Sequence, residues 1–68
     1  MIMKSVRSSN VGSVGFENGT MRVQFKGGGL YQYSGVPESL YGSFMSASSP
    51  GSFFRSHFSG RYGEAKIG

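Results

Sequence analysis

Residues 31–38 read Tyr-Gln-Tyr-Ser-Gly-Val-Pro-Glu, and here the chain changes from a strand pattern to a helix start. The two tyrosines alternate with polar residues, as in a strand with one buried face. Proline suits the first position of a helix, and the glutamate after it favours the positive helix end. We therefore expect a strand that ends near Ser34 and a helix that runs from Pro37 to Met45 or Ser46.

Upstream, the dipeptide Asn18-Gly19 predicts a β-hairpin, because a type I′ turn needs positive φ at both central residues. The register that follows pairs Glu17 with Thr20, Phe16 with Met21, Val14 with Val23 and Gly12 with Phe25. It gathers the large apolar side chains on one face and leaves Arg22 and Gln24 on the other. This alternation is typical of an antiparallel sheet with one solvated face.

The run Gly27-Gly28-Gly29 then turns the chain into a third strand, residues 30–34. If all three glycines form the loop, Lys26 pairs with Leu30 and Phe25 with Tyr31. Tyr31 and Tyr33 then join the apolar face. A loop of two residues would turn both tyrosines outward, because a slip of one residue inverts every side chain. We expect the first of these two registers.

Downstream, Ser49-Pro50 predicts a second short helix with Ser49 as N-cap, and Gly60 ends it. Residues 63–68 are expected to form a tail that frays. The predicted fold is α+β: a three-stranded antiparallel β-meander with two short helices packed on one face, in the order β-β-β-α-α. We expect one domain, residues 1–68, with a core over about residues 3–62.

Composition narrows the classes of function. The 68 residues include no cysteine, one histidine and three carboxylates, a set that cannot build the usual zinc or di-metal centre. No two carboxylates have a spacing that suggests general acid–base chemistry, so we expect no enzyme and no cofactor. A chain this short buries little surface, so a homo-oligomer is the expected source of further stability. The sequence shows neither a run of about 20 apolar residues nor a signal-peptide core, and a cytoplasmic location is expected.

The start of the second helix is the best candidate for an anion site. Ser49, Gly51 and Ser52 offer free backbone N–H groups and hydroxyls, and Arg55 follows one turn later. Helix N-termini attract phosphate because unpaired donors and the helix dipole both favour negative charge. The alternative is ordinary capping beside surface arginines. The net charge of +4 is spread along the chain and favours anionic partners.

The motifs occur together in one order: the paired tyrosines, the proline-started helix, Ser49-Pro50-Gly51-Ser52-Phe53-Phe54-Arg55, and Gly60-Arg61-Tyr62. In this order they resemble the KTSC domain family, over roughly residues 3 to 62. That family is named from the C-terminus of some lysyl-tRNA synthetases and includes stand-alone bacterial and phage proteins. The resemblance implies that a ligand uses Ser52, Arg55, His57, Gly60, Arg61 and Tyr62.

A polar triplet, Ser8-Ser9-Asn10, precedes the first strand, and the family has a similar triplet. It either caps the strand or supplies Ser8 and Asn10 to the rim of a pocket. The chain departs from the family after Tyr62, where Gly63-Glu64-Ala65 replaces further aromatic and basic residues. This difference from the family weakens the case for a basic tail that binds RNA.

These observations predict a non-catalytic binding module for an anionic, nucleotide-type ligand. A small stand-alone protein of this kind would act by sequestering a nucleotide signal, as some phage anti-defence proteins do. One alternative is the RNA-binding role suggested for the family, with stacking by Tyr62. The other is a protein–protein adaptor that uses exposed aromatic residues.

Overall fold

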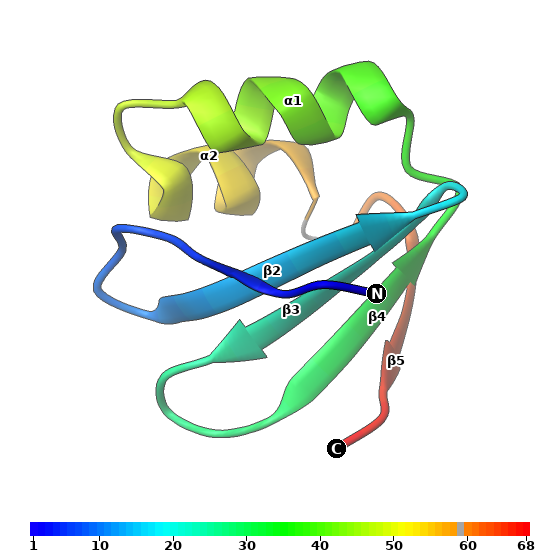
Figure 1. Cartoon of the computed structure of the whole chain (residues 1–68), viewed down its shortest axis with the longest axis horizontal. Helices are drawn as coiled ribbons and strands as arrows, with labels where there is room; N and C mark the ends of the chain where they lie inside the picture. The colour runs from blue at the N-terminus through cyan, green and yellow to red at the C-terminus, as the bar shows by residue number, and fades with distance from the viewer. Residues whose placement is uncertain (59) are drawn as a thin grey trace.

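The computed structural model describes residues 1–58 and 60–68 and contains one antiparallel sheet with two helices on one of its faces (Figure 1). The elements in chain order are β1 (Lys4–Ser5), β2 (Val11–Glu17), β3 (Thr20–Phe25), β4 (Leu30–Ser34), α1 (Glu38–Ser46), α2 (Pro50–His57) and β5 (Gly63–Lys66). The strands lie side by side in the same order, β1-β2-β3-β4-β5. Among the described residues, no helix has the length and apolar content needed to cross a membrane.

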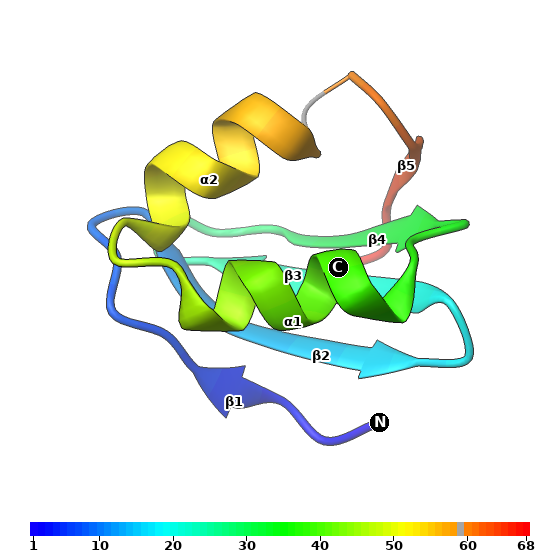
Figure 2. The ribbon, with the colours of Figure 1, turned by 90° about the horizontal axis from the view of Figure 1, so that it is seen from above.

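The sheet has five strands, so the expected count of three is wrong by the two edge strands. Figure 2 shows β1 and β5 at opposite edges. β1 is two residues long, and all the residues of β1 and β5 are exposed. Such strands carry no alternation of apolar and polar residues, which is the signal that predicts a strand. In the structure, residues 63–66 pair with β4 and do not form the frayed tail that was expected.

The β2–β3 hairpin has the predicted turn and most of the predicted register. Asn18 and Gly19 have φ values of 49° and 78°, as a type I′ turn requires. The predicted pairs from Glu17–Thr20 to Val14–Val23 are present. At the far end, Phe25 pairs with Val11 and not with Gly12, because the register shifts between Val11 and Ser13. This bulge turns Val11 into the core, where it is fully buried.

The β3–β4 connection differs from the expected pairing by two residues. Gln24 pairs with Leu30 and Val23 with Tyr31. A shift of two residues preserves the face of every side chain, since side chains alternate with period two. Tyr31 and Tyr33 consequently lie on the helix side of the sheet, as predicted, and Tyr33 is only 1% exposed.

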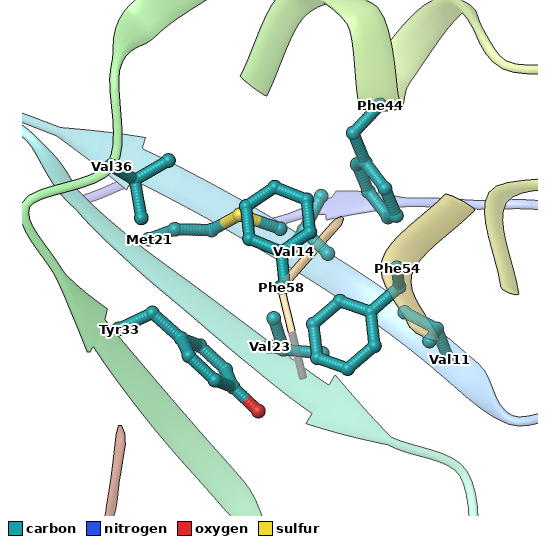
Figure 3. Packing of buried hydrophobic residues seen from close by; sticks show 9 residues of the cluster. All are labelled: Val11, Val14, Met21, Val23, Tyr33, Val36, Phe44, Phe54 and Phe58. Atoms are coloured by element: carbon teal, nitrogen blue, oxygen red, sulfur yellow. The ribbon is translucent and has the colours of Figure 1, made fainter. Parts of the chain in front are cut away.

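Both helices begin within one residue of the predicted positions. α1 follows Pro37, and α2 begins at Pro50 after Ser49. The buried aromatic residues Phe44 of α1, Phe54 of α2 and Phe58 directly after α2 pack on the sheet beside Tyr33 (Figure 3). Tyr33 meets Phe54 edge to face with ring centroids 5.5 Å apart, and Phe44 meets Phe58 in the same way at 5.8 Å, whereas Phe54 and Phe58 are stacked. The buried core consists of Val11, Val14, Met21, Val23, Tyr33, Val36, Phe44, Phe54 and Phe58.

Candidate anion-binding pocket

A cavity of about 270 Å³ lies between the loop that joins β1 to β2 and the beginning of α2. Two segments about forty residues apart in the chain form its walls, together with one side chain from the second turn of α2. The lining residues are Arg7, Ser8, Ser9, Asn10, Ser48, Ser49, Pro50, Gly51, Ser52 and Arg55. The cavity thus brings together six of the predicted ligand-binding residues: Ser8, Asn10, Ser49, Gly51, Ser52 and Arg55.

The loop wall is held in shape by local hydrogen bonds. Ser8 Oγ accepts hydrogen bonds from the backbone N–H groups of Asn10 and Val11, both at 3.3 Å. It also lies 3.0 Å from Asn10 Oδ1. The backbone carbonyl of Asn10 accepts a hydrogen bond of 2.8 Å from the N–H of Lys26, which follows β3. The polar triplet is therefore both a turn and one wall of the pocket.

The helix wall leaves its first N–H donors without a side-chain cap. Ser49 occupies the N-cap position as predicted, but its side chain makes no capping hydrogen bond. Its hydroxyl instead donates to Ser52 Oγ at 3.1 Å. An N-cap side chain usually binds the N–H of the second or third helical residue. Without that bond, the N–H groups at the start of α2 can be offered to an anion.

Gly51 allows the two walls to approach each other closely. A Cβ placed on this residue would lie 3.0 Å from Ser8 Oγ and 3.2 Å from Asn10 Oδ1. Contacts that short force the neighbouring atoms to move. The absence of a side chain at Gly51 therefore sets the distance between the loop and the helix.

The charge of the lining is positive. Arg7 and Arg55 are the only charged residues among those the structure describes in the lining, and they come from different walls. A second cavity, of about 400 Å³, has both signs of charge in its lining, beside the stacked rings of Phe16 and Tyr41. Glu17 and Glu38 stand there with Lys4 and the N-terminal ammonium group of Met1, which lies 3.3 Å from Glu17 Oε1. Its two carboxylates offset these two cations, whereas the described lining of the first cavity has an excess of positive charge, so the first cavity is the better anion site.

Three predicted site residues, His57, Arg61 and Tyr62, are absent from the described lining and belong to the far end of α2 and the turn after it. His57 stacks on Phe53 with ring centroids 4.0 Å apart. Tyr62 is half-buried, with its ring 5.9 Å from that of Phe58. Arg61 is exposed, and its backbone N–H donates to the carbonyl of Phe58. One turn of helix brings Arg55 to the pocket, whereas the two helix ends are too far apart to share one small site.

Sequence reasoning did not single out Arg7 as a site residue. The sequence feature that indicates a role for Arg7 is its position directly before Ser8-Ser9-Asn10. This position indicates a site residue only when the loop is known to face α2.

Comparison with known proteins gives the family. The KTSC domain family matches residues 7–62. The crystal structure of a KTSC domain protein from Yersinia pestis is 40% identical, covers 98% of this chain and 97% of that chain, and superposes with a TM-score of 0.95. No curated protein matches the chain. Because the family match spans most of the residues, the chain belongs to the KTSC domain family.

Proposed function

We propose that this chain is a non-catalytic module that binds an anionic, nucleotide-type ligand, with a phosphate seated between the β1–β2 loop and the start of α2. The observation that carries the proposal is the uncapped start of α2, which faces a cavity whose described lining is charged only by Arg7 and Arg55. Uncapped N–H groups and guanidinium groups are both strong donors to phosphate oxygens.

Each wall has a distinct role in this proposal. The backbone N–H groups at Gly51 and Ser52 bind phosphate oxygens along the helix axis. Arg7 and Arg55 hold the phosphate from two sides, where a planar guanidinium can make two parallel hydrogen bonds. The hydroxyls of Ser8 and Ser49 complete the polar shell.

The size and lining of the cavity favour recognition of the phosphate over recognition of the base. Its volume of about 270 Å³ is close to the lower end of ligand pockets, which is about 300 Å³. No aromatic residue stands in the described lining. The base therefore extends beyond the cavity in this proposal, and a protein with such a site acts by sequestering its ligand. We also propose that the chain forms a homo-oligomer, in which a second copy would add surface for the base.

The test is a thermal-shift series on the purified chain with inorganic phosphate, mononucleotides, dinucleotides, cyclic nucleotides and a short RNA. A ligand at about 100 times its dissociation constant stabilises the folded state by about 2.7 kcal/mol, which raises the Tm of a domain this small by roughly 10 °C or more. We expect Arg55→Ala to lose most of that rise. Arg61→Ala is the matched control, because its side chain is exposed beyond the far end of α2.

The outcomes separate the candidate functions. Equal loss of response in both arginine variants would contradict the assignment of the phosphate to this pocket. RNA binding is the second candidate, favoured by the net charge of +4 and a pI of about 9.9. It would appear as a response to RNA alone that weakens steeply with salt. A protein–protein adaptor would respond to none of these ligands.

A further inference from the structure

The last strand, β5, adds almost nothing to the apolar core. All four of its residues, Gly63–Lys66, are exposed. It pairs with β4 from Ser34–Gly63 to Tyr31–Lys66, and the chain after it makes backbone hydrogen bonds with Leu30. The match to the KTSC domain family ends at Tyr62, directly before this strand. β5 is thus attached mainly by its backbone ladder.

One side-chain hydrogen bond joins β5 to the core. The hydroxyl of Tyr33 donates to Glu64 Oε2 at 2.5 Å. Tyr33 is 1% exposed and packs against Phe54, so its hydroxyl has a fixed position at the margin of the core (Figure 3). Hydrogen bonds to an ionised carboxylate are roughly twice as strong as neutral ones. This bond fixes an exposed strand to a rigid buried residue.

The edge that β5 covers would otherwise be open. β4 has the sequence Leu-Tyr-Gln-Tyr-Ser, which is rich in strand-forming residues and carries no charge. An uncovered edge of this composition pairs readily with any extended segment.

We propose that the Tyr33–Glu64 hydrogen bond is a latch that holds β5 on the edge of β4, and that β5 opens as a unit while the rest of the domain stays folded. The core supports this independence, because its buried residues come from β2, β3, β4, the two helices and the segments that directly flank the helices. Opening uncovers the N–H and C=O groups of β4 that pair with β5 in the closed state.

Native-state hydrogen exchange of the full chain tests the latch. Tyr33→Phe keeps the ring and removes the donor, so we expect the amides of residues 64–68 that face β4 to exchange about tenfold faster or more. The amides of the β2–β3 ladder should keep their wild-type rates. Glu64→Gln keeps an acceptor but removes its charge, and a smaller increase is expected.

Tyr31→Phe is the matched control. Tyr31 lies in the same strand and pairs with Lys66, and its hydroxyl makes no hydrogen bond among the described residues. It should leave exchange in β5 unchanged. Wild-type exchange of β5 in Tyr33→Phe would overturn the latch. An equal increase in the β2–β3 ladder would overturn the independent opening.

Discussion

At the scale of the residue, the missing side chain of Gly51 is the feature that most directly shapes the candidate site. The loop and the helix meet where a Cβ would lie only 3.0 Å from Ser8 Oγ and 3.2 Å from Asn10 Oδ1, so a side chain there would push these atoms away. The Ser8 hydrogen bonds fix the shape of this loop, and the hydrogen bond from the Lys26 N–H to the Asn10 carbonyl ties the loop to the end of β3. Gly51 therefore determines the geometry of the pocket, although it supplies only backbone atoms to it.

We predict that Gly51→Ala removes the ligand-induced rise in Tm. Alanine favours a helix over glycine by about 1 kcal/mol, and the contacts with Ser8 and Asn10 oppose this gain. The free energy of unfolding should consequently change by less than about 1 kcal/mol. Urea denaturation and the thermal-shift assay together measure both effects.

Gly42→Ala serves as its control. Gly42 lies inside α1, and a Cβ there would meet no atom within 4 Å. This variant should gain about 0.5–1 kcal/mol in stability and keep the ligand response. A normal ligand response in Gly51→Ala would show that the loop and the helix need not stay this close.

At the scale of the element, the β2–β3 hairpin organises the sheet and also positions the first helix. Its turn requires positive φ at Asn18 and Gly19. The carbonyl of Gly19 accepts a hydrogen bond of 2.9 Å from the N–H of Val36, just before α1. The turn therefore connects the hairpin with the beginning of the helical layer.

Gly19→Ala is expected to lower the free energy of unfolding by about 1–2 kcal/mol. The cause is backbone strain at φ 78°, since the nearest atom to a Cβ there is the Val36 carbonyl oxygen, at 3.8 Å. Gly27→Ala is the control, because a Cβ at Gly27 meets nothing within 4 Å and its φ lies outside the left-handed region. Chemical denaturation of both variants measures the difference, and equal stability would argue against strain at the turn.

At the scale of the whole molecule, stability depends on a small core in which a tyrosine hydroxyl has a structural role. A chain of 68 residues has a free energy of unfolding on the order of 3–10 kcal/mol. Burial raises the pKa of Tyr33 far above its usual value of 10.0, and the hydrogen bond to Glu64 and the nearby charge of that carboxylate add to the rise. Burial also raises the pKa of Tyr41. The folded state therefore keeps the protons of these two phenols to a higher pH than the unfolded chain does.

Because both pKa values are raised in the folded state, the free energy of unfolding falls at high pH. Below pH 10 the two tyrosines are neutral in both states, and their contribution to stability is fully present. Above pH 10 the unfolded chain releases protons that the folded chain retains, so unfolding becomes easier. We predict a fall of up to about 1.4 kcal/mol per pH unit from the buried Tyr33 and a smaller fall from Tyr41, which is only partly buried.

Urea denaturation at pH 9 and pH 11 measures this loss. Tyr33→Phe should lose less stability between these two pH values than the wild type, because one raised pKa is removed. An identical loss in the variant would mean that Tyr33 is ionised as easily in the fold as in the unfolded chain.

Local sequence signals predicted much of the fold. The Asn18-Gly19 turn, the alternating faces of β2 to β4 and the helix starts at Pro37 and Pro50 each depend on residues that are close in the chain. Their physical causes are steric and local: positive φ, the ring of proline and the two-residue period of a strand. The β3–β4 register shows the limit, because a glycine loop accepts several pairings of the same parity.

Long-range packing decided the rest. The bulge that buries Val11, the edge strands β1 and β5, and the partnership of Tyr33 with Glu64 all need contacts that no local pattern records. The same holds for the candidate pocket, which unites Arg7 with Arg55 and leaves Arg61 at the other end of α2. Sequence by itself determined which segments become strands, turns and helices, because backbone sterics and hydrophobic period act over a few residues. Only the tertiary structure decided which polar side chains share a site, because that depends on how distant segments pack together.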